Sequence, residues 1–198
     1  MTTRAGRALL PHPDVRLLEE RRLHSGVVFD VLHQRLQLPS GLEQSLDLIA
    51  HSGAVCVLAR RADGRVLLVR QYRPAASDWL EEIPAGRLEP GEDPLCAARR
   101  ELEEETGHRA ARWRYVRTFL VAPGFASERM HLFEATELTE VPGGGLACDA
   151  DEELAIRWAS PEELLRLEPQ DAKTLVAALA CLQGGGPQAP PDGASAAT

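Results

Sequence analysis

The segment GRLEPGEDPLCAARRELEEETG, residues 86–107, constrains the fold more than any other part of the chain. A Pro-Gly turn is followed by Asp93 and Pro94, residue types that favour the N-cap and the first position of a helix. Leu95, Ala98 and Leu102 then recur at helical spacing, and a glycine at position 107 favours a helix stop. The sequence therefore predicts a loop followed by a helix with one buried face.

The second half of this helix is crowded with carboxylates, which come from Glu101, Glu103, Glu104 and Glu105. Glu101 and Glu105 are four positions apart, so their side chains project together, with Glu104 beside them. Like charges at this spacing destabilise a helix by about 0.2–0.5 kcal/mol per pair. A hard cation such as Mg²⁺, which prefers oxygen ligands, would relieve the repulsion. A solvated acidic face is the alternative interpretation.

The remainder of the chain reads as strands with a few helices. Apolar runs at 54–59 and 66–72 flank RRADG and predict a hairpin. Further strands are expected at 27–38, 112–122, 130–138 and 154–160. Helices are expected over 160–167, where Ser160 and Glu163 suit a capping box, and over 171–182. This order of elements predicts an α+β fold with a mixed sheet.

Composition excludes several classes of protein. The net charge of −8 and the lack of a basic run argue against a nucleic-acid partner. The four cysteines form no C-x-x-C pair, which favours reduced thiols and a cytoplasmic location over a zinc site or a disulfide framework. No apolar run reaches the roughly 18 residues of a membrane span. The first fourteen residues lack the apolar stretch of a signal peptide, so neither membrane nor export is expected.

The loop and the acidic helix together resemble the Nudix box, the signature of a hydrolase family. The pattern is Gly, five residues, Glu, seven residues, then Arg-Glu-aliphatic-x-Glu-Glu-x-Gly. It is matched by Gly86, Glu92, Arg100, Glu101, Leu102, Glu104, Glu105 and Gly107. The family pattern ends in an aliphatic residue, and His108 stands there instead, which we expect to weaken packing more than chemistry. The resemblance implies an α/β/α sandwich with a mixed sheet, here preceded by antiparallel N-terminal strands.

The resemblance also implies an active site that hydrolyses the diphosphate between a nucleoside and another group. The implied cofactor is Mg²⁺, with Mn²⁺ as the alternative. The implied metal ligands are Glu101, Glu104, Glu105 and the backbone carbonyl of Ala85. Arg100 would orient the carboxylates, and Glu92 would brace the junction of loop and helix. For the general base, the resemblance points to the late acidic loop CDADEELAIRW, from which we choose Glu152. A glutamate of the helix is the alternative base.

Segments outside the box resemble the ADP-ribose pyrophosphatase branch of this family. They are HSGAVCVLA, VRQYRP, EEIPAGRLEPGE and APGFASERMHLFEA, and Pro123 stands where the branch has a proline. By resemblance Arg73 would reach a phosphate, Glu128 would bind the terminal ribose, and Phe29 would stack on adenine in a swapped dimer. The alternatives are a surface ion pair for Arg73, a polar loop for Glu128 and core packing for Phe29.

These inferences predict three regions: an N-terminal strand region over 1–48 that forms a homodimer, a hydrolase domain over 49–183, and a disordered Gly/Pro/Ala tail over 184–198. The expected reaction is metal-dependent hydrolysis of ADP-ribose to AMP and ribose 5-phosphate. Alternatives are another nucleoside diphosphate sugar, such as GDP-mannose, or a non-enzymatic module that senses ADP-ribose. The sequence leaves open the preferred sugar, the metal and the oligomeric state.

Overall fold

The computed structural model describes residues 11–142 and 155–182, which divide between two compact units. The first unit comprises Met1–Gly53 together with Leu120–Arg129, and the second comprises Ala54–Phe119 and Met130–Thr198. The predicted tail over 184–198 lies outside the described residues. No helix in the described part of the chain is long and apolar enough to cross a membrane.

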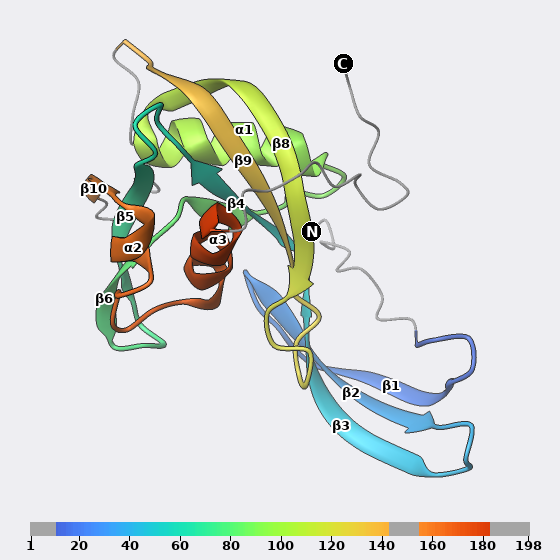
Figure 1. The fold of residues 1–198 in the computed structure, drawn as a ribbon. Helices are drawn as coiled ribbons and strands as arrows, with labels where there is room; N and C mark the ends of the chain where they lie inside the picture. The colour runs from blue at the N-terminus through green and yellow to red at the C-terminus, as the bar shows by residue number, and fades with distance from the viewer. Residues whose placement is uncertain (1–10, 143–154, 183–198) are drawn as a thin grey trace. The chain divides into compact units, whose positions relative to one another are not determined.

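The first unit is built on an antiparallel sheet of three strands in the order β1-β2-β3 (Figure 1). The strands are β1 (Arg16–Ser25), β2 (Phe29–Gln37) and β3 (Glu43–His51). The segment 120–129 is bound to the last strand, because Ile49 N donates to Phe125 O at 2.7 Å and Ser127 N donates to Ile49 O at 2.9 Å. The loop that carries Glu128 is therefore part of this unit.

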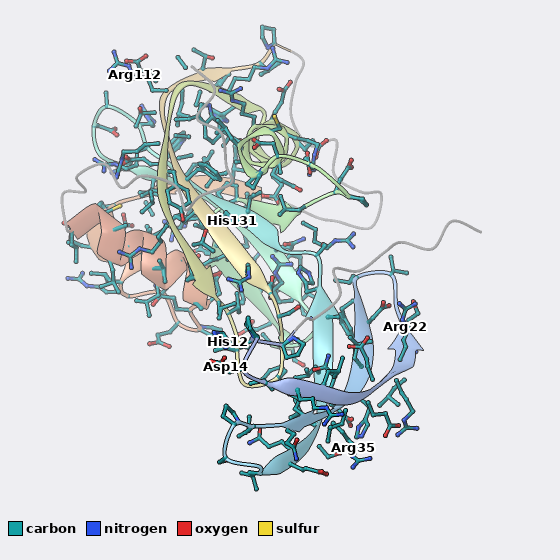
Figure 2. The ribbon with its side chains drawn as sticks, turned by 90° about the vertical axis from the view of Figure 1, so that its right-hand side faces the viewer. His12, Asp14, Arg22, Arg35, Arg112 and His131 are labelled. Carbon is teal, nitrogen blue, oxygen red and sulfur yellow. The ribbon has the colours of Figure 1, made fainter. Side chains whose placement is uncertain are left out.

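Ion pairs cover much of this sheet. Arg22 pairs with Asp30 at 3.4 Å and Arg35 with Glu43 at 3.1 Å, and Figure 2 shows both arginines on the sheet. Apolar side chains gather in the exposed part of β1, the turn after it and the start of β2. Phe29 is 40% exposed, so core packing, the alternative for this residue, is not what the described structure shows.

The second unit contains two sheets. One has four strands in the order β7-β4-β9-β8, and the other has three in the order β10-β5-β6. Strands β4 and β9 are parallel, whereas β7 runs antiparallel to β4, so the larger sheet is mixed. The bounds are β4 Ala54–Ala59, β5 Val66–Arg73, β6 Asp78–Glu82, β7 Ala85–Arg87, β8 His108–Leu120, β9 Arg129–Glu140 and β10 Ala155–Ala159.

Helices cover both faces of the sheets in this unit. They are α1 (Pro94–Thr106), α2 (Pro161–Leu164) and α3 (Ala172–Leu182) (Figure 1). Side chains of a strand point alternately to opposite faces, so Val55 and Val57 of β4 pack in one cluster with Leu102 of α1. Cys56 of the same strand packs in the other cluster, with residues of α3 that include Ala177. The expected α+β sandwich with a mixed sheet is confirmed.

Local signals in the sequence correspond closely to the element ends. Asp93 caps α1 by accepting from the backbone N–H groups of residues 95 and 96, at 2.9 and 3.2 Å. Gly107 ends the helix with φ of 66°, a left-handed conformation that glycine adopts readily. The capping box of Ser160 and Glu163 is confirmed. The short strands β6 and β7, however, lie in DWLEEIPAGR, where the sequence indicated none.

Candidate active site

The backbone between β6 and β7 is held at three consecutive residues by distant parts of the second unit. Ile83 N donates to Thr174 Oγ1 at 3.1 Å, and Val57 N donates to Pro84 O at 2.8 Å. Ala85 N donates to Glu105 Oε2 at 3.0 Å. These bonds join the segment to α3, to β4 and to α1 respectively. The backbone of Ala85, an implied metal ligand, is therefore held close to the acidic helix.

A side chain of helix α1 lies directly against the backbone of β7. A Cβ atom added to Gly86 would overlap the carboxylate of Glu101, so a larger residue there would displace that carboxylate. Glycine thus leaves space for Glu101 beside Ala85, and it is not needed for an unusual backbone angle.

Arg100 gathers the carboxylates of this region around one guanidinium group. Its Nε and Nη2 donate to the two oxygens of Glu92 at 3.0 and 2.9 Å. Its Nη1 donates to Glu101 Oε1 at 2.8 Å and to Glu104 Oε2 at 3.0 Å, so these two carboxylates share one nitrogen. Nη2 also reaches the carbonyl oxygen of Arg87 at 3.2 Å, which joins the loop to the helix.

Burial gives the carboxylates different electrostatic environments. Burial raises the pKa of Glu101 above its ordinary value, and the hydrogen bond from Arg100 opposes that shift. In Glu92 the hydrogen bonds from Arg100 are the largest influence, and they lower its pKa. Glu105 is only 8% exposed, whereas the side chain of Glu104 is 42% exposed. The region thus combines two buried carboxylates with a more solvated one.

The donor chemistry of this region fits a hard divalent cation, because the carboxylates of Glu101, Glu104 and Glu105 and the Ala85 carbonyl supply only oxygen. Within residues 11–142 and 155–182, however, no three His, Cys, Asp or Glu side chains are grouped so as to hold a metal ion. Glu101 and Glu104 instead turn one oxygen each toward Arg100. The assignment of these residues as metal ligands stays a prediction.

A second cluster of charges lies on the other side of the same backbone segment. The buried Glu82 carboxylate accepts from Arg73 Nε at 3.1 Å and from Arg73 Nη2 at 2.7 Å. Lys173 Nζ donates to the same carboxylate at 2.7 Å. Burial alone would raise the pKa of Glu82, but the hydrogen bonds and charges of its two partners outweigh burial and lower it.

Sequence reasoning missed Glu82 and Lys173. Glu82 belongs to the segment EEIPAG, which was taken only as a mark of resemblance. A compositional signal could have found Lys173, because it is the only lysine among the 22 Lys and Arg residues of the chain. In the structure this single lysine forms a buried ion pair with Glu82.

The other predicted residues are distributed as follows. Phe29 and Glu128 lie in the first unit, and Arg73, Ala85 and the box residues lie in the second. Glu152, the chosen general base, lies outside the described residues. His108 is buried, 7% exposed, and its ring meets Trp158 edge-on with centroids 5.7 Å apart. An imidazole thus fills the place of the aliphatic side chain, and the expected weakening of packing stays a prediction.

Comparison with known proteins agrees with this fold. A model of the NUDIX domain matches residues 50–179, which is more than half of the chain. A solved structure titled as an ADP compounds hydrolase has the same fold, with a TM-score of 0.73 and 21% identity over 86% of this chain and 93% of that one. The chain belongs to the Nudix hydrolase family, and it is a hydrolase of the pyrophosphatase kind.

Two relatives share enough sequence with this chain to show the same family. The ADP-ribose pyrophosphatase of Bacillus subtilis is 37% identical over 82% of this chain and 89% of its own length. The methanol dehydrogenase activator of Bacillus methanolicus is 33% identical over the same shares of the two chains. Members of the family generally use a divalent metal, as the oxygen-rich site would suit.

The contact between Gly86 and Glu101 yields a test of the site. Replacing Gly86 with Ala should displace the Glu101 carboxylate, and misplacement on this scale should lower kcat/KM for diphosphate hydrolysis by about a hundredfold. Glu103→Gln is the control, because this glutamate of the same helix pairs with Arg109 at the surface. Steady-state kinetics and a thermal melt of each variant provide the measurement. Equal kcat/KM in both variants would show that the close approach is not needed.

Proposed function

We propose that this protein hydrolyses ADP-ribose to AMP and ribose 5-phosphate with the help of a divalent cation. The observation that supports this most is the set of box carboxylates: Arg100 gathers Glu92, Glu101 and Glu104, and Glu105 accepts from the Ala85 N–H. The name of the Bacillus subtilis relative, ADP-ribose pyrophosphatase, narrows the diphosphate to ADP-ribose. A cytoplasmic location is part of this proposal.

The residues divide the work as follows. Glu101, Glu104, Glu105 and the carbonyl of Ala85 would hold Mg²⁺ or Mn²⁺, which when bound neutralises phosphate charge and activates water. Arg100 keeps the carboxylates of Glu101 and Glu104 together. Arg73 binds the diphosphate: among the described bonds Nε and Nη2 are taken by Glu82, so Nη1 is the donor assigned to a phosphate oxygen.

The remaining roles rest on the resemblance. Glu128 binds the terminal ribose and Phe29 stacks on adenine, both within the first unit of the chain. Glu152 accepts the proton of the attacking water, and a glutamate of α1 is the alternative base. GDP-mannose or a related nucleoside diphosphate sugar is the alternative substrate. The relative named methanol dehydrogenase activator shows that similar chains carry names other than pyrophosphatase, so the substrate must be measured.

We also propose that the protein is a homodimer through its N-terminal strands. The support is the apolar surface of the first unit, where Leu23, Val27 and Val28 are 49%, 77% and 47% exposed. Such a group of exposed side chains, rimmed by ion pairs, is typical of a protein–protein contact. A two-fold pair would bury the same surface on both copies.

The substrate is tested with a panel of nucleotides and analysis of the products. With Mg²⁺ present, ADP-ribose should give AMP and ribose 5-phosphate, and ATP and 8-oxo-dGTP should be hydrolysed far more slowly. The reason is the set of segments shared with the ADP-ribose branch, above all Pro123 and the GFASER loop. A triphosphate with the higher kcat/KM would contradict the substrate while leaving the family unchanged.

The metal ligands are tested by Glu101→Gln and Glu105→Gln. Each change removes one carboxylate charge from a proposed ligand without emptying the core, so turnover should fall by about a hundredfold or more. The matched control is Glu103→Gln on the same helix, whose side chain pairs with Arg109 at the surface. Activity near the wild-type value for both ligand variants at saturating Mg²⁺ would refute the assignment.

The dimer is tested by light scattering at micromolar concentration. Leu23→Asp combined with Val28→Asp places charges on the apolar surface of the first unit, and the protein should become monomeric because buried charge is costly. Leu179→Asp, on an exposed position of α3, should leave the mass unchanged. If the wild-type protein is itself monomeric and active, the homodimer is wrong.

A further inference from the structure

Lys173 stands out in both the sequence and the structure. It is the only lysine of the chain, and every other residue of its charge type is arginine. Its side chain is 10% exposed and lies between two carboxylates, with Nζ 2.7 Å from Glu82 Oε2 and 2.6 Å from Asp171 Oδ2. A buried ammonium group with two charged partners is a costly arrangement unless its geometry serves a purpose.

The carboxylate of Glu82 connects Lys173 to Arg73. Only 2% of the Glu82 side chain is exposed, and it receives the ammonium on one side and the guanidinium fork of Arg73 on the other. Two cations and the two carboxylates of Glu82 and Asp171 leave the cluster without net charge. Arg73 and Lys173 therefore share one buried carboxylate, so a change at the ammonium can act on the guanidinium group through Glu82.

The same turn of α3 also holds the backbone of the site. Asp171 Oδ1 accepts from Thr174 N at 2.7 Å, and Asp171 Oδ2 accepts from Thr174 Oγ1 at 3.1 Å. Thr174 Oγ1 in turn accepts from Ile83 N at 3.1 Å. Ile83 is two residues before Ala85, whose N–H donates to Glu105. Hydrogen bonds from the start of α3 and from the acidic helix thus hold the same short backbone segment, at Ile83 and at Ala85.

The chemistry of lysine explains why arginine does not replace it here. The ammonium group is compact and donates in three directions, so it can reach two carboxylates from one point. The guanidinium group of arginine is a wide planar fork that pairs best with one carboxylate at a time. Arg73 already occupies one side of Glu82 in that way, which leaves room for a compact partner on the other side.

We propose that Lys173 is a positioning residue of the diphosphate site. Through Glu82 it orients the guanidinium group of Arg73 toward the substrate. The inference rests on the proposed function, because it takes Arg73 as a ligand of the diphosphate. The competing interpretation is that Lys173 only stabilises the fold.

The first test compares Lys173→Met with a matched control, Arg157→Met. Arg157 of β10 pairs with Glu81, the neighbour of Glu82 on β6, at 2.6 and 2.5 Å. The control therefore also removes the cationic partner of a β6 carboxylate. Lys173→Met should raise KM for ADP-ribose about tenfold, the effect of one weakened charged hydrogen bond, while kcat changes less than about threefold. The control should change neither constant. Equal KM values in the two variants would overturn the proposal.

A second test separates positioning from stability. In the background of Arg73→Ala, Lys173→Met should raise KM no further, because the group that it orients is gone. Effects on KM that multiply in the double variant, together with a parallel loss of melting temperature, would show a purely structural role. Lys173→Arg keeps the charge, so its KM should lie between the values of Lys173→Met and the wild-type protein. This variant still tests the proposal if Lys173→Met does not fold.

Binding of ADP distinguishes failure of this inference from failure of the proposed function. Calorimetry with ADP and Mg²⁺ reports on the diphosphate contacts without turnover. If wild-type protein does not hydrolyse ADP-ribose but Lys173→Met weakens ADP binding about tenfold, the proposed function fails and the positioning role stands. If wild-type protein hydrolyses ADP-ribose but ADP binds both proteins equally, the function stands and the positioning role is wrong.

Discussion

The close approach of α1 to β7 is the constraint on which the site depends. Because a Cβ atom at Gly86 would overlap the Glu101 carboxylate, that carboxylate keeps its place against the strand only with glycine there. The approach brings the acidic face of the helix to the backbone of Ala85, where Glu105 accepts the Ala85 N–H. Without this contact the glutamates would form an ordinary acidic surface on a helix, which is the alternative that the sequence left open.

Negative charge at such density needs compensation, and the protein supplies it from two sides. Arg100 lies within the acidic helix and donates four hydrogen bonds to the carboxylates of Glu92, Glu101 and Glu104. A fifth hydrogen bond goes to the carbonyl oxygen of Arg87, at the end of β7. On the other side, Arg73 and Lys173 enclose Glu82. The backbone from Ile83 to Ala85 is bonded at both ends to the helices that carry these clusters. Ile83 N donates to Thr174, the neighbour of Lys173 on α3, and Ala85 N donates to Glu105 on α1.

Much of the fold could be predicted because its signals are local. The caps at Asp93 and Gly107 and the capping box at Ser160 each depend on residues a few positions apart. The predicted hairpin around RRADG is wrong, because β4 and β5 pair in different sheets and meet only at an isolated bridge between Arg60 and Val66. The short strands β6 and β7 escaped prediction because they exist only through pairing with β5 and β4. The contact of His108 with Trp158 could not be predicted for a related reason, since the two rings are distant in the sequence.

The sequence by itself determined the family and the acidic helix, because the box is a continuous pattern whose spacing follows the turn of a helix. Only the tertiary structure decided that residues 120–129 belong with the N-terminal strands, through bonds to Ile49. It also decided that Lys173 meets Glu82, which is 91 positions away. Such contacts depend on how separate elements pack, and a single lysine in a sequence looks the same whether it is solvated or buried between carboxylates.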